Sequence, residues 1–146
     1  MRIWGTVFAI TVATAVTLAV AKDVSIEDLK SRAANAKPDE RVGLCLEIAE
    51  HQVKAADKLY NEGNVDAAQA AIRDVVSYSR QAGEAASQTG HHLKNTEIAM
   101  RKMTHHLVDI KRNVAFENQA PLQTAIESLE KIRTDLLDSM FGKKAK

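Results

Sequence analysis

Apolar residues recur every three or four positions along most of the chain, which is the period of an α-helix. Four segments show this pattern, at about 39–61, 64–88, 91–115 and 120–141, and each stripe continues for about three heptads. The stripe of the second segment steps strictly by three and four: Val65, Ala68, Ile72, Val75, Ser79, Ala82 and Ala86. No stretch after residue 21 alternates with a period of two, so the pattern predicts helices and no β-sheet.

Turn and capping residues mark the ends of these segments. Pro38 suits the first turn of a helix, where its missing N–H costs no hydrogen bond. Gly63 can take a positive φ in the next turn, and Asn64 can cap the helix that follows it. Ser25 can cap a shorter helix that we predict at about 26–35.

Short loops between long helices favour antiparallel neighbours. The sequence therefore predicts an all-α fold, an antiparallel four-helix bundle with up-down-up-down topology and a short extra N-terminal helix. Two stacked helical hairpins are the alternative arrangement. In domain terms, we expect a short helix and linker at 22–37, the bundle at 38–142 and a basic tail at 143–146.

The turn at Gly63 and Asn64 carries a family resemblance. Residues 59–68 (LYNEGNVDAA), followed by Ile72 and Val75, resemble the turn region of a tetratricopeptide repeat. The resemblance rests on an aromatic residue before the turn, a glycine within it and apolar residues after it, although no second copy recurs about 34 residues later. It implies tetratricopeptide-like hairpins, a protein-binding groove and a candidate interaction turn at Tyr60, Gly63 and Asn64.

Residues 1–21 follow a different pattern from the rest of the chain. Arg2 precedes an uncharged apolar run, which ends in an A-x-A sequence at Ala21. A basic start, an apolar stretch and such a site are the three parts of a secretory signal peptide. We therefore predict cleavage after Ala21 and export to the periplasm or the medium. The alternative is an N-terminal membrane anchor, because ~17–25 apolar residues suffice to span a bilayer; the membrane is a partner only in that case.

Charge and aromatic content argue against a nucleic-acid partner. Cleavage would remove Arg2 and no acidic residue, so 20 basic residues would become 19, equal to the 19 acidic ones. A chain without net positive charge lacks the bulk attraction to phosphate on which nucleic-acid binding depends. Four aromatic residues would remain, Tyr60, Tyr78, Phe116 and Phe141, which are too few for a row of base-stacking platforms.

Paired histidines on one helix suggest a metal site. The pairs at 91/92 and 105/106 lie about 21 Å apart along one helix, so they cannot share an ion within it. His92 and His106 fall on the edge of the apolar stripe, and Gln52 falls on the edge of another. A Gln52–His106 contact would fix the helix register or form part of a ligand or metal site. We expect no metal, and these three residues are the candidates if one binds.

Cys45 and the sequence motifs give no indication of catalysis. Cys45 lies in an apolar stripe, where it is either a buried small hydrophobe or the partner of a disulfide between chains. The sequence contains no C-x-x-C-H haem motif, no glycine-rich phosphate loop and no G-x-S-x-G elbow. We therefore predict no cofactor and no enzymatic activity.

These observations lead to one functional prediction and one alternative. The prediction is an exported, non-catalytic helical-bundle protein of the cell envelope, an interaction or structural module with a protein partner or self-association. The alternative is a ligand- or metal-binding bundle that uses the histidines of the fourth helix.

Overall fold

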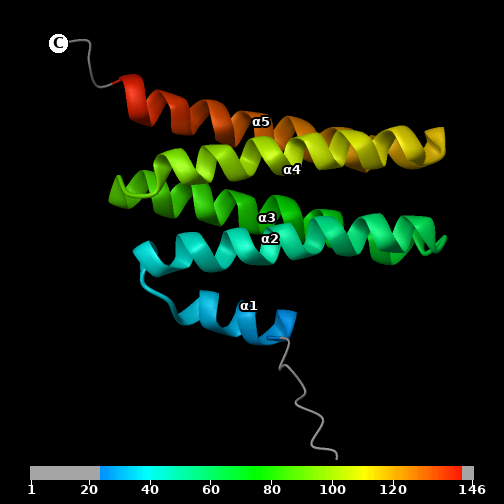
Figure 1. Cartoon of the computed structure of the whole chain (residues 1–146), viewed down its shortest axis with the longest axis horizontal. Helices are drawn as coiled ribbons and strands as arrows, with labels where there is room; N and C mark the ends of the chain where they lie inside the picture. Colours follow the sequence, from blue (N-terminus) through cyan, green and yellow to red (C-terminus); the bar gives the residue numbers. More distant parts are fainter. Residues whose placement is uncertain (1–23, 143–146) are drawn as a thin grey trace, which may run out of the picture.

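The computed structural model describes residues 24–142 and is built from five α-helices and one 3-10 turn (Figure 1). The elements are α1 (Ile26–Asn35), α2 (Pro38–Asn61), α3 (Val65–Thr89), α4 (Leu93–Asn113), η1 (Phe116–Asn118) and α5 (Gln119–Phe141). No strand occurs within residues 24–142, so the prediction of an all-α helical bundle is confirmed. The predicted signal peptide at 1–21 and the basic tail at 143–146 lie outside the described residues.

Helix ends follow the predicted capping chemistry closely. The Ser25 side chain accepts a hydrogen bond from the Asp28 N–H at 3.2 Å, and α2 begins at Pro38. Gly63 takes φ 77°, and the Asn64 N–H donates to the Leu59 carbonyl at 2.9 Å, which closes the last turn of α2.

The fourth helix begins two residues later than the apolar pattern predicts. Gly90 and His92 both take left-handed backbone angles, with φ of 71° and 60°. A helix cannot continue through such residues, so α4 begins at Leu93. The pair of left-handed residues turns the chain sharply between α3 and α4.

The helices pack as two hairpins, one stacked on the other. The most extensive contacts are α2 with α3 and α4 with α5, and the hairpins meet mainly where α3 contacts α5 and α2 contacts α4. Figure 1 shows that α2 and α4 run in one direction while α3 and α5 run in the other. The described residues of α2 and α5 share no comparable contact, although a sequential ring of four helices would make them neighbours. The packing order therefore favours the alternative of two stacked hairpins.

A close approach between α3 and α5 explains this order. Gly83 of α3 faces Ile132 of α5, and a Cβ atom added at Gly83 would lie 2.7 Å from Cγ2 of Ile132. The optimal separation of two nonbonded carbon atoms is ~3.5–4.0 Å. The absence of a side chain at Gly83 thus lets α5 pack against α3, where a sequential bundle would place α4.

The core is continuous through both hairpins. Among the described residues it is mostly aliphatic, and the largest side chains with almost no exposure include Leu29, Ile48, Met100, Leu107, Ile110, Leu122, Leu129 and Leu136. Alanines fill much of α3, which permits close helix contact. Glu97 of α4 is buried and accepts a hydrogen bond from Nε of Arg133 of α5 at 2.6 Å, so the second hairpin also has an internal ion pair.

Helix α1 is attached to the first hairpin by polar contacts as well as by Leu29. Nζ of Lys30 lies 2.8 Å from Oδ2 of Asp74 on α3, and burial is partial at both ends of this ion pair. The Arg41 guanidinium donates to the carbonyl groups of Ala33 and Ala36, at 3.2 and 2.9 Å. A cation at these carbonyls satisfies acceptors that the end of α1 leaves unpaired.

None of the helices within residues 24–142 is long and apolar enough to cross a bilayer.

We predict that Gly83→Ala lowers the free energy of unfolding by about 1 kcal/mol. Overpacking costs ~1–3 kcal/mol, and the better helix propensity of alanine offsets ~1 kcal/mol of that cost. Gly43 of α2 is the matched control, because it is exposed and a Cβ atom there meets nothing within 4 Å. Gly43→Ala should raise stability by up to about 1 kcal/mol. Urea unfolding followed by circular dichroism measures both changes.

A double variant isolates the contact. In an Ile132→Ala background the obstructing methyl group is gone, so Gly83→Ala should no longer destabilise the protein. An equal loss of stability in both backgrounds would show that Gly83 acts through something other than Ile132.

Candidate functional site

The three candidate metal ligands do not converge in the structure. His92 is the N-cap residue of α4, and its Nε2 lies 3.4 Å from Oδ1 of Asp39. His106 Nε2 lies 3.3 Å from Oδ2 of Asp57 on α2. The Gln52 amide donates to Asp74 at 2.9 Å, on the side of α2 that faces α3. The expected Gln52–His106 contact is therefore replaced by two separate contacts with carboxylates.

The histidines at the α3–α4 link form a small polar cluster. Nδ1 of His91 lies 3.0 Å from Oδ1 of Asp39, the same oxygen that His92 approaches. The hydrogen bond with His91 holds the pKa of the Asp39 carboxyl below its ordinary value, and the positive charge of a protonated His92 adds to this effect. Within residues 24–142, however, no group of three or more His, Cys, Asp or Glu side chains is arranged to hold a metal ion.

The candidate interaction turn has a structural role that its residues explain. Gly63 supplies the positive φ, and the Asn64 side chain accepts a hydrogen bond from the Ala67 N–H at 3.4 Å. Gly63 and Asn64 are exposed, while Tyr60 is half-buried and its hydroxyl group is covered without a hydrogen-bond partner. These residues join α2 to α3, and their part in binding stays a prediction.

Cys45 is buried, as one of the two readings of its position predicted. Its exposed fraction is 0% and it forms no disulfide in the described structure. Desolvation raises the pKa of the Cys45 thiol to about 11, with a smaller opposing effect from the positive charge of Arg41. A thiol in this state packs as a small hydrophobe.

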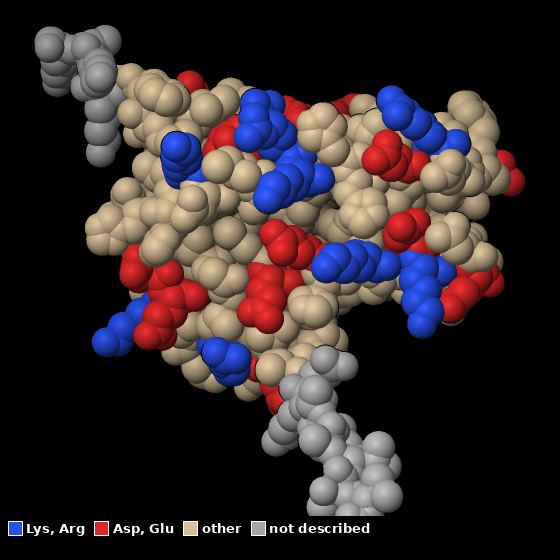
Figure 2. Space-filling model, in the orientation of Figure 1, with Lys and Arg blue, Asp and Glu red and all other residues tan. Residues whose placement is uncertain are grey.

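The outer surface does not concentrate charge of one sign on the face that Figure 2 shows. Lys and Arg side chains intermingle there with Asp and Glu side chains and with uncharged residues. A partner would therefore be selected by a recess or a local arrangement of charges rather than by the overall charge of that face.

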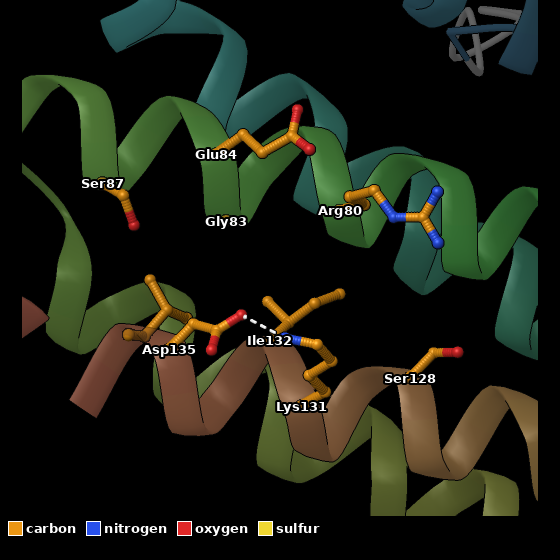
Figure 3. A pocket seen from close by; sticks show the side chains of 9 residues that line it. Arg80, Gly83, Glu84, Ser87, Ser128, Lys131, Ile132 and Asp135 are labelled. Carbon is orange, nitrogen blue, oxygen red and sulfur yellow. Dashed lines mark hydrogen bonds and ion pairs between the residues drawn. The ribbon is translucent and has the colours of Figure 1, made fainter. Parts of the chain in front are cut away.

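One recess runs between α3 and α5 and consists of two adjoining hollows. The first encloses about 370 Å³ and is lined by Arg80, Gly83, Glu84, Ser87, Ser128, Lys131, Ile132, Asp135 and Leu136 (Figure 3). The second encloses about 430 Å³ and is lined by Gln69, Ile72, Arg73, Val76, Arg80, Pro121, Thr124, Ala125 and Ser128. Arg80 and Ser128 belong to both hollows, so we treat them as one feature, the α3–α5 groove.

The floor of the α3–α5 groove follows from the close approach of the two helices. In Figure 3, Gly83 and Ile132 face each other across the groove between the two ribbons. Hydroxyl groups on the α5 side point their hydrogen atoms toward the backbone of their own helix. Thr124 donates to the carbonyl of Ala120 at 3.1 Å, and Ser128 donates to the carbonyl of Thr124 at 2.9 Å. The groove therefore presents apolar carbon and hydroxyl lone pairs between charged edges.

Charge is distributed unevenly along the groove. Arg73 lies on the half beside the start of α5, Arg80 lies where the two hollows join, and no acidic residue lines the second hollow. Glu84 lines the other half, where Nζ of Lys131 lies 3.2 Å from Oδ2 of Asp135, the dashed contact in Figure 3. One half of the groove is thus basic, and the other carries both signs.

Sequence reasoning missed this groove because it paired α3 with the wrong neighbour. The available signal was Gly83, a glycine inside a long helical pattern at a cost of ~1 kcal/mol relative to alanine. Such a glycine often marks a close approach of another backbone. The sequence alone does not show which helix approaches.

Comparison of the chain with protein-family models, with curated proteins and with solved structures gives no match in any of the three. The similarity of the α2–α3 turn to a tetratricopeptide repeat therefore remains a local resemblance, and the function is argued from the geometry of the described residues.

We predict that Cys45 is unreactive in the folded protein. The thiolate is the nucleophile, and a pKa of about 11 leaves little of it at pH 8. Alkylation with iodoacetamide should be at least ~100-fold slower than in the urea-unfolded chain, where the thiol pKa returns to ~8.5, and should accelerate with rising pH. Mass spectrometry of timed samples measures it. Rapid alkylation at pH 8 would mean that the thiol opens to solvent, and non-reducing electrophoresis would then reveal any disulfide dimer.

Proposed function

We propose that this protein is an exported, non-catalytic interaction module that holds a segment of a partner protein in the α3–α5 groove. The observation that carries the proposal is the groove itself, which extends across both hairpins and has charged residues on both edges. Helix-lined grooves commonly receive a helical segment of another chain.

The dimensions of the groove support a polypeptide occupant. Its α3 side extends from Gln69 to Ser87, which corresponds to about 27 Å of helix. An occupant of that length is a helix of about 18 residues. Val76, Pro121 and Ile132 are half-buried and leave some apolar surface for such a segment to cover.

The side chains of the groove support binding rather than chemistry. The hydroxyl groups of Thr124 and Ser128 donate to backbone carbonyls, and Lys131 is paired with Asp135. A nucleophile needs an adjacent base that removes its proton. The hydroxyl and amino groups of Thr124, Ser128 and Lys131 are engaged in contacts within α5.

We expect a photo-crosslinking amino acid placed at Thr124 to form a discrete adduct with a partner protein in the native cell envelope. His105 is the matched control, because it is exposed on α4 and does not line the groove. A second variant, Ser128→Trp, should block the groove and abolish the Thr124 adduct without a change in the helical circular dichroism signal. The same adducts from Thr124 and His105, or an adduct that survives Ser128→Trp, would contradict a role for the groove.

The export part of the proposal has its own test. Residues 1–21 carry the three features of a signal peptide, so we expect the native protein to begin at Lys22. Intact-mass spectrometry of protein purified from its own cells measures the N-terminus. Retention of Met1 or of residues 3–20 would favour the anchored alternative, whereas the groove proposal would be unaffected.

A further inference from the structure

Two arginines in the α3–α5 groove have no charged partner in the described structure. Arg73 and Arg80 are exposed, and neither forms an ion pair or a hydrogen bond with another residue in the range 24–142. They are seven residues apart, which is about two helical turns or 10.5 Å along α3. They therefore lie on the same side of α3, at the two ends of the second hollow.

The groups that line the second hollow leave the positive charge of these arginines uncompensated there. Asp74 is adjacent to Arg73 in the sequence, but its carboxylate is bound by Lys30 and Gln52 on the other side of α3. Helix α5 has no acidic residue in its first turn and no side-chain cap, and its positive dipole end lies beside Pro121 in the same hollow. Glu84, one turn beyond Arg80, lines the first hollow together with it, but does not line the second hollow.

Charge decides selectivity in this half of the groove because little apolar surface remains to be covered. Ile72 and Ala125 line the hollow, but their exposed fractions are only 2% and 1%. An occupant can bury only the half-exposed carbon of residues such as Val76 and Pro121. Where the buried area is small, charge complementarity sets specificity and the rate of association.

We propose that the occupant is an amphipathic helix that carries two carboxylates seven residues apart, one for each of Arg73 and Arg80. This inference rests on the proposed function of the groove. A helix that runs along α3 presents side chains i and i+7 at the same spacing as the two arginines. A guanidinium group is a planar fork of donors that matches a carboxylate in two parallel hydrogen bonds. Small apolar residues between the two carboxylates face the floor of the hollow.

The charges in the other half of the groove determine which end of the bound helix lies beside the start of α5. Glu84 repels a third carboxylate placed one turn beyond Arg80, and the Lys131–Asp135 pair adds no net positive charge there. The acidic end of the bound helix therefore lies beside the start of α5, and its neutral or basic end lies beside Glu84.

Labelled synthetic peptides test the inference with the purified protein. The probe is a blocked 18-residue alanine–leucine helix with Glu at two positions seven apart, and the control peptides carry Gln or Lys at the same positions. Fluorescence anisotropy at low salt should show the Glu peptide binding about tenfold more tightly than the Gln peptide, since each exposed charge pair contributes a factor of ~1.4–5. The Lys peptide should bind more weakly than both, and the advantage of the Glu peptide should shrink at high salt.

Paired variants locate the effect. Arg73→Gln with Arg80→Gln should remove the preference for the Glu peptide, whereas Arg101→Gln with Arg112→Gln on α4 should preserve it; thermal unfolding checks that both variants fold. The inference is overturned by equal binding of the Glu and Gln peptides, by equal losses in the two variants, or by no binding of the Glu peptide. In each of these cases, an adduct at Thr124 that Ser128→Trp abolishes would still support the proposed function. The absence of any adduct at Thr124 would contradict both the proposed function and this inference.

Discussion

The contact between Gly83 and Ile132 sets how closely α3 and α5 pack. A glycine at this point of α3 lets the side chain of Ile132 approach the backbone more closely than any other residue would allow. Ridge-into-groove packing depends on how near two helix axes can come, so a single missing side chain can select one neighbour over another. Gly83 and Ile132 also line the groove between the stacked hairpins, so this contact shapes the groove as well.

The same contact links stability to the candidate site. The floor of the α3–α5 groove is made by the residues at which the hairpins meet, so a change that separates the hairpins also widens the groove. Rim residues such as Arg73 and Glu84 are exposed and contribute little to the core. The rim can therefore vary without much loss of stability, whereas the floor cannot. The packing of the hairpins and the charges of the rim thus rest on separate sets of residues.

The sequence predicted the helices well because each of them is specified locally. The signals for a helix lie within a few residues of the feature that they determine: the apolar period, Pro38, Gly63 and the cap at Ser25. The predicted start of α4 was wrong by two residues because His92 takes a left-handed conformation, which is uncommon for residues other than glycine and which the apolar pattern does not reveal. The pairing of α3 with α5, and so the groove, depends on contacts between distant residues that a local pattern does not encode. For the same reason the partners of Gln52 and His106, which lie on other helices, could not be read from helix faces alone.

The attachment of α1 has a consequence for the order in which the chain folds. A ten-residue helix is marginal on its own, and α1 acquires its partners from residues that come later in the sequence. Arg41 caps its carbonyl groups, and Asp74, 44 residues beyond Lys30, anchors its side chain. Helix α1 therefore completes its polar contacts only when both α2 and α3 are in place.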